Sequence, residues 1–146
     1  MTYWPYLLAI VVGAGLTLQV GMNGTIGTTV GSPLLASVVN FVIGTVALCA
    51  VALARGARIA PGTAATVPAW AWLGGLFGAA YVAAVTVLGP RLGAVALLAL
   101  VLLGQMAAAL VVDHFGIVGF PERAVSLSRL AGVVLLVAGV VLVARK

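Results

Sequence analysis

Residues 34–54 read LLASVVNFVIGTVALCAVALA and contain no charged side chain. At the α-helical rise of about 1.5 Å per residue, such a stretch crosses a hydrocarbon core about 30 Å thick. Its apolar residues are continuous and lack the in-out alternation of a membrane β-barrel strand. The stretch therefore predicts a transmembrane helix. Pro33 stands where a first helical turn accepts proline, and Arg55 and Arg58 follow the helix.

Four other segments share this length and apolar character, so we expect five membrane-spanning helices. The predicted spans are residues 5–28, 34–54, 70–88, 92–112 and 129–144. Tight turns are expected at Gly31-Ser32-Pro33 and Gly89-Pro90-Arg91, and longer loops at residues 56–69 and 113–128. The sequence thus predicts an all-α membrane protein whose 146 residues form a single five-helix transmembrane domain.

The composition excludes several classes of protein. Hydrophobic residues make up 64% of the chain and charged residues 6%, against roughly 45–50% and about 25% in soluble domains. A soluble enzyme or a disordered chain is therefore excluded, and membrane lipid is the expected surrounding partner. The seven Lys and Arg residues are scattered, so no nucleic-acid surface is expected. With one histidine and one cysteine, Cys49, the sequence predicts no metal site, no cofactor and no catalytic nucleophile–base pair.

The basic residues give almost no signal for orientation. Five spans place the two termini on opposite sides of the membrane. The basic residues on the N-terminal side are Arg55, Arg58, Arg123 and Arg129, and those on the other side are Arg91, Arg145 and Lys146. Because an excess of Lys and Arg normally marks the cytoplasmic side, four against three leaves two explanations. Either one orientation is weakly encoded or fixed by a partner, or the chain inserts both ways and forms an antiparallel homodimer of ten helices, which we favour.

Short motifs along nearly the whole chain carry a family resemblance. They are Gln19-x-x-x-Asn23, Gly31-Ser32-Pro33, Trp70-x-Trp72-x-Gly74-Gly75-x-x-Gly78, Gly93-Ala94, Gly104-Gln105, Asp113-His114-Phe115-Gly116-x-x-Gly119 and Arg129-x-x-Gly132. In this order they resemble the YdcZ family of bacterial inner-membrane proteins, within the drug/metabolite transporter superfamily. The resemblance implies five helices per protomer, near-zero charge bias, paired or fused inverted halves, a location in the inner membrane, and a transporter or exporter of undefined substrate.

Four amide side chains lie within the predicted spans, where polar groups are costly. Gln19 and Asn23 share one helix face at i, i+4. By helical rise, Gln19 lies near the midplane, Asn23 and Asn40 lie level with each other, and Gln105 lies at the matching depth on the opposite side. In an antiparallel dimer these amides form a symmetric ring, which predicts a substrate-binding site. The alternative is that each amide only joins helices.

No acidic or basic residue lies deep within a predicted span. Because an amide cannot exchange a proton at physiological pH, proton-coupled antiport of cations through a central carboxylate is disfavoured. The sequence predicts instead a small neutral or weakly polar solute, bound by hydrogen bonds in an apolar pocket. Tyr81, in the middle of the third span, is the aromatic residue best placed to take part in binding, including recognition of an ammonium group.

Asp113 and His114 end the fourth span and are the ionisable pair nearest the membrane. A helix C-terminus disfavours an anion, so Asp113 needs a cationic partner, with Arg129 and Arg123 as the candidates. The pair then either ties the following loop to the helix ends or acts as a gate, using a histidine that titrates near neutrality.

The function that these observations favour is secondary transport by alternating access in the antiparallel dimer. Three alternatives stay open. A passive channel on the same dimer would conduct without saturation, a lipid flippase would suit so apolar a chain, and a structural accessory subunit would need another membrane protein as partner.

Overall fold

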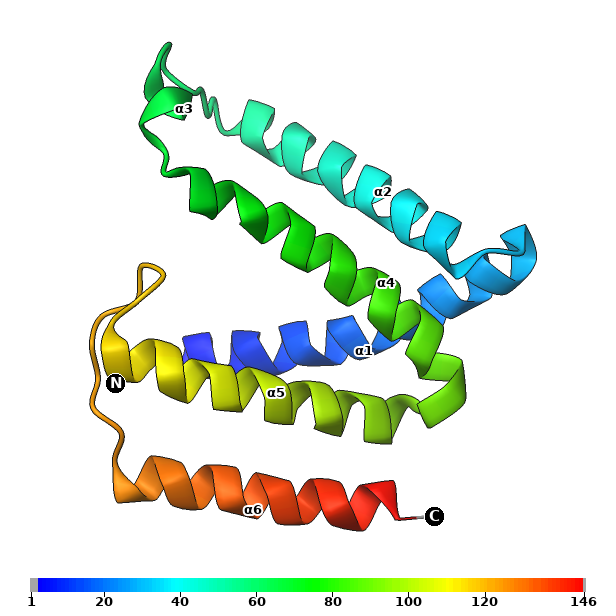
Figure 1. Ribbon diagram of the computed structural model, residues 1–146. Coiled ribbons are helices and arrows are strands. Elements are labelled where there is room, and N and C mark those ends of the chain that lie inside the picture. The colour runs from blue at the N-terminus through cyan, green and yellow to red at the C-terminus, as the bar shows by residue number, and fades with distance from the viewer. Residues whose placement is uncertain (1–2, 146) are drawn as a thin grey trace. The chain divides into compact units, whose positions relative to one another are not determined.

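The computed structural model describes residues 3–145, and all regular secondary structure in this range is helical (Figure 1). Its elements are α1 (Trp4–Val30), α2 (Pro33–Ala54), α3 (Thr63–Thr66), the 3-10 helix η1 (Ala69–Leu73), α4 (Gly74–Leu92), α5 (Ala94–Phe115) and α6 (Leu127–Ala144). Five helices are long and apolar enough to span a membrane, with η1 and α4 counted as one. The prediction of an all-α chain with five spans is confirmed. Lys146, counted above among the basic residues, lies outside the described residues.

The chain divides into two compact units between Arg91 and Leu92. The first unit holds α1, α2, α3, η1 and α4, and the second holds α5 and α6. Each unit is described separately below.

The turn between α1 and α2 follows the predicted Gly31-Ser32-Pro33 sequence. Gly31 closes α1 with φ of +73°, in the left-handed region that glycine enters without steric cost. Ser32 caps α2, because its Oγ accepts a hydrogen bond from the Leu35 amide at 3.3 Å. Pro33 is the first residue of α2, where its missing amide hydrogen costs nothing. These local preferences reverse the chain within two residues.

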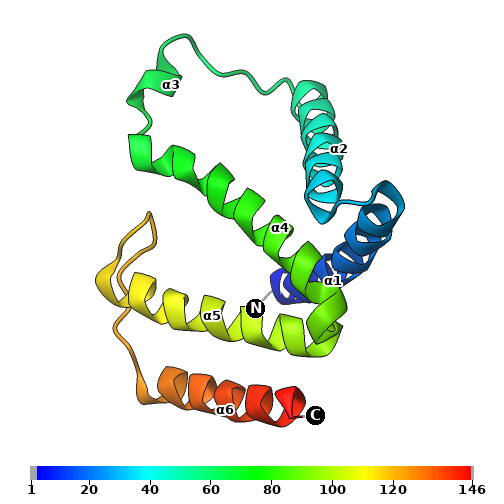
Figure 2. The ribbon, with the colours of Figure 1, turned by 45° about the vertical axis from the view of Figure 1, so that its right-hand side comes forward.

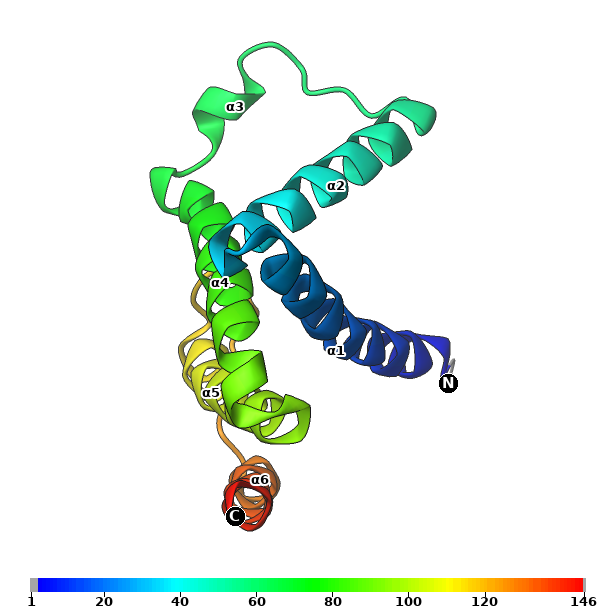
Figure 3. The same ribbon diagram turned by 90° about the vertical axis from the view of Figure 1, so that its right-hand side faces the viewer.

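Close packing next to this turn holds α1 against α2. A Cβ atom placed on Gly27 would lie 3.3 Å from Pro33 Cα and 3.6 Å from Ala36 Cβ, so any larger residue would push the helices apart. Figures 2 and 3 show that α1, α2 and α4 converge at this end and diverge toward their other ends. The buried residues of the first unit lie mainly near the convergence: Val20, Asn23, Gly27, Ala36, Ser37, Val82, Val85 and Thr86. The first unit is therefore packed at one end and open at the other.

The predicted turn at Gly89-Pro90-Arg91 is wrong. Helix α4 continues through Pro90 to Leu92, and the break between α4 and α5 falls at Gly93, whose φ is +78°. Pro90 has no amide hydrogen to donate to the Thr86 carbonyl, so the last turn of α4 lacks this helical hydrogen bond. The positive φ at this break is one that glycine adopts without steric cost.

Other helix boundaries differ from the predicted ones by a few residues. The first span extends to both sides of residues 5–28, and the last begins at Leu127 instead of Arg129 because Ser126 caps it. Ser126 Oγ accepts a hydrogen bond from the Arg129 amide at 3.4 Å. The loop expected at residues 56–69 contains the short helix α3.

In the second unit, α5 packs against α6 and the loop between them is tied at its base. Arg129 Nη1 lies 3.4 Å from Asp113 Oδ2 and also 3.4 Å from the Arg123 carbonyl oxygen, to which it donates. The Arg123 amide donates to the Asp113 carbonyl oxygen at 2.6 Å. The carboxylate at the C-terminus of α5 is therefore compensated by the first turn of α6.

We predict that Asp113→Asn lowers the stability of the detergent-solubilised protein by about 0.5–1 kcal/mol, since this ion pair is only part-buried. The thermal unfolding midpoint should fall by a few degrees at low ionic strength, and the difference should shrink in 1 M NaCl because salt screens exposed charges. Glu122→Gln is the matched control, because no ion pair of Glu122 is found among residues 3–145. An equal fall for both variants would contradict the assignment of the stabilisation to the Asp113–Arg129 pair.

Candidate functional site

Three of the five predicted substrate-binding residues line one cleft in the first unit. Gln19 comes from α1, Asn40 from α2 and Tyr81 from α4. We call this space the amide cleft; its volume is about 440 Å³, within the range of about 300–1,000 Å³ that is usual for small-molecule sites. Its lining is completed by Leu16, Phe41, Ile43, Gly44, Thr45, Leu48, Gly78 and Val82.

A hydrogen bond joins the two amides of the cleft. Gln19 Nε2 donates to Asn40 Oδ1 at 3.1 Å, and both side chains are half-buried. Among residues 3–145 no partner is found for Gln19 Oε1, Asn40 Nδ2 or the Tyr81 hydroxyl. The cleft therefore offers an acceptor, a donor and a hydroxyl to a bound solute.

Asn23 lies one helical turn from Gln19 but does not line the amide cleft. Only 2% of Asn23 is exposed, and its Nδ2 finds no hydrogen-bond partner in the part of the chain that the structure describes. A buried donor without a partner costs about 1–3 kcal/mol. The position is therefore unfavourable in this conformation.

The remaining predicted residues lie in the second unit. Gln105 is on an exposed part of α5, so the amide cleft as described is built from the first unit alone. Asp113 and Arg129 form the ion pair given above. His114 is exposed and packs edge-on against Phe115, with 4.8 Å between ring centroids. The gating role of these three residues stays a prediction.

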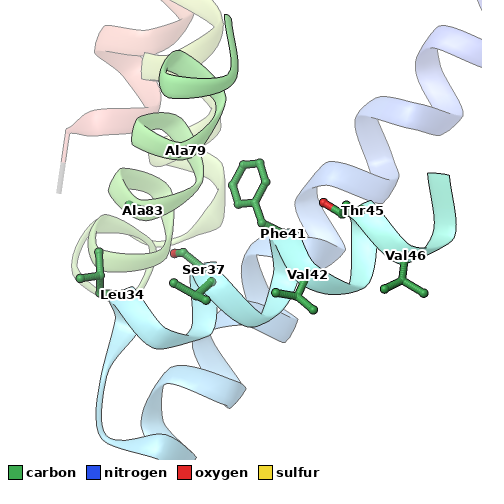
Figure 4. Close-up of a pocket in the computed structure, with 9 residues that line it drawn as sticks. Leu34, Ser37, Phe41, Val42, Thr45, Val46, Ala79 and Ala83 are labelled. Atoms are coloured by element: carbon green, nitrogen blue, oxygen red, sulfur yellow. The ribbon is translucent and has the colours of Figure 1, made fainter. Parts of the chain in front are cut away.

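A second space, which the sequence did not reveal, lies between α2 and α4 (Figure 4). We call it the apolar groove; its volume is also about 440 Å³. Its lining residues are Leu34, Ser37, Val38, Phe41, Val42, Thr45, Val46, Ala79 and Ala83. One signal pointed to a close approach here: within the Gly74-Gly75-x-x-Gly78 motif, Gly78 is the glycine that faces α2, at Phe41.

Comparison with known proteins agrees with this architecture. A family model described as "Putative inner membrane exporter, YdcZ" matches residues 4–142, nearly the whole chain. No curated protein and no solved structure matches the chain significantly. The five apolar helices and the family match together identify a multi-pass protein of the inner membrane. The chain belongs to the YdcZ family of inner-membrane exporters.

Proposed function

We propose that the protein exports a small neutral or weakly polar solute that binds in the amide cleft, and that it does so by alternating access in an antiparallel homodimer. The observation that carries this proposal is the Gln19–Asn40 hydrogen bond on the wall of a cleft of ligand size. Polar side chains within membrane spans are costly and are usually retained for a function.

The depth of the cleft supports a transport site. By helical rise, Gln19 lies about 17 Å from the end of α1 at Val30. Tyr81 lies about 17 Å from the end of α4 at Leu92 by the same measure. Both positions are near the middle of a hydrocarbon core about 30 Å thick, where transporters hold their substrates.

The lining of the amide cleft indicates the class of solute. It contains no Asp, Glu, Lys, Arg or His side chain, so a charged solute would enter without a counter-charge. Two amides and a phenol recognise a neutral solute through hydrogen bonds, and the aliphatic lining accepts its apolar part.

The shape of the first unit suits one-sided access. Helices α1, α2 and α4 converge at one end and diverge at the other, as the views in Figures 1 and 3 agree. The diverging end is the one that holds the start of α1. In an antiparallel homodimer the second copy would present its diverging end to the opposite side of the membrane. Two exchanging conformations of such a pair would supply alternating access.

Replacement of the amides tests the binding site. We expect Gln19→Ala and Asn40→Ala each to weaken saturable counterflow in proteoliposomes about tenfold, since each removes one hydrogen bond to the solute. The assay screens radiolabelled neutral amides and alcohols for the compound that gives the strongest counterflow. Thr25→Val is the control, because within residues 3–145 the Thr25 hydroxyl bonds only the Gly21 carbonyl, at 3.1 Å, and does not line the cleft. Unsaturable flux in the parent protein would indicate a channel instead.

Replacement of Asn23 distinguishes between two roles for this amide, one in transport and one in joining helices. We expect Asn23→Leu to raise the thermal unfolding midpoint, because it removes a buried donor that lacks a partner. The same variant should lose counterflow, if a second conformation satisfies the Asn23 side chain during transport. A lower midpoint in Asn23→Leu would show that Asn23 joins helices in the resting protein and would contradict the proposed role.

Topology tests the antiparallel dimer. In a chain with Cys49→Ala and a single cysteine added after Lys146, we expect an impermeant maleimide to label about half of the molecules from each side of the membrane. Replacing Arg91 and Arg145 together should shift the labelling toward one side, because four basic residues on the N-terminal side then stand against one on the other. Labelling from one side only in the parent chain would exclude the antiparallel homodimer.

A further inference from the structure

We infer that the amide cleft and the apolar groove are two compartments of one binding site, and that this site takes an uncharged amphipathic solute. The polar head of the solute binds Gln19, Asn40 and Tyr81, and its apolar body passes Phe41 into the groove. This inference rests on the proposed function, since it names the substrate class of the same site.

Two side chains belong to both compartments. Phe41 and Thr45 line the amide cleft and also the apolar groove. They lie one helical turn apart on α2, and Figure 4 shows the Phe41 ring rising from α2 between the α4 side and Thr45. The wall between the two spaces is therefore made of side chains, which can change rotamer, and not of backbone.

The Phe41 ring lies beside Gly78. A Cβ atom on Gly78 would lie 3.8 Å from Phe41 Cζ, an ordinary contact distance, so the glycine itself leaves space beside the ring. The residue as a whole is 38% exposed. Rotation of one aromatic side chain against a glycine needs no movement of helices, so Phe41 can admit or block an apolar chain of matching width.

The hydroxyl of Thr45 adds a polar contact at the boundary. Ser37, the other hydroxyl residue of the groove, donates to the Pro33 carbonyl at 3.1 Å, and Thr86 in α4 donates to the Val82 carbonyl at 2.7 Å. No such backbone bond is found for Thr45 within residues 3–145. Thr45 therefore keeps a free hydroxyl where the polar compartment meets the apolar one.

The contrast between the compartments defines the occupant. Nine residues line the groove, and apart from the hydroxyl residues Ser37 and Thr45 all of them carry hydrocarbon side chains. Neither lining contains a basic residue, so the phosphate of a phospholipid head group would lack a counter-charge. A neutral head with an alkyl or aryl body satisfies both linings, and each buried methylene should tighten binding about fourfold until the groove is full.

The test uses photolabelling of the full chain in nanodiscs. The probes are octanamide and butanamide, each with a diazirine at the end of its alkyl chain, and the labelled residues are located by mass spectrometry. We expect the octanamide probe to label the groove around Leu34, Val38 and Val42, and excess unlabelled octanamide to compete this labelling away. The butanamide probe should label the amide cleft.

Three variants separate the compartments. Gln19→Ala with Asn40→Ala should remove groove labelling by the octanamide probe, although neither residue touches the groove. Val42→Trp, which fills the groove without touching the amide cleft, should lower octanamide labelling at least fivefold and leave butanamide labelling within twofold. Phe77→Trp is the matched control, since Phe77 is 74% exposed and lines neither space.

Each other outcome overturns the inference. Groove labelling that persists in the Gln19→Ala, Asn40→Ala protein would show a separate lipid site. Labelling confined to the amide cleft by both probes would refute the second compartment and leave the proposed function standing. Absence of competed labelling in either space would refute the substrate class together with the proposed function.

Discussion

An amide side chain in hydrocarbon needs a hydrogen-bond partner, and the bond between Gln19 and Asn40 meets that need across two helices. The bond fixes which face of α1 meets α2 beyond the first two turns of α2. Near the α1–α2 turn, Gly27 brings the same two helices into close contact at Pro33 and Ala36. Between these two points lies Asn23, which is buried and unsatisfied. The first unit thus combines a closely packed end with a polar middle in which one buried hydrogen-bond donor has no partner.

This combination suits the proposed alternating access, which requires two conformations. Helices that were packed along their whole length would have one stable arrangement, whereas helices joined at one end can hinge there. The amide cleft lies where α1, α2 and α4 separate, so its shape depends on the angle between these helices. Asn23 Nδ2, close to the packed end of the first unit, is buried without a hydrogen-bond partner, which raises the free energy of this conformation. A second conformation that gives Asn23 a partner would relieve that cost.

Much of the fold follows from the sequence alone, because continuous apolar stretches of sufficient length admit few structures in a membrane. Residues 34–54 illustrate this, since the helix found there begins one residue earlier and ends at the same residue. The break at Gly93 was missed because proline is the more familiar helix breaker, yet α4 continues through Pro90 to Leu92. Gln19, Asn40 and Tyr81 could be selected from the sequence because polar side chains are costly within a membrane span. That they line one cleft could not be predicted, because it depends on which faces of α1, α2 and α4 meet. The sequence did not indicate that Phe41 and Thr45 line both spaces. In so apolar a chain, a residue that lines a cleft cannot be told from one that faces lipid.

The absence of charged side chains from the amide cleft also bears on energetics. Moving one elementary charge through a membrane potential of 100 mV involves about 2.3 kcal/mol, a large contribution to any transport cycle. A neutral solute carried by a cleft without charged side chains moves no charge, so the electrical component of the membrane gradient does no work on that step. The energy for net movement must then come from a concentration difference, either of the solute itself or of a second uncharged species exchanged for it. Such a cycle would run equally well in polarised and depolarised membranes.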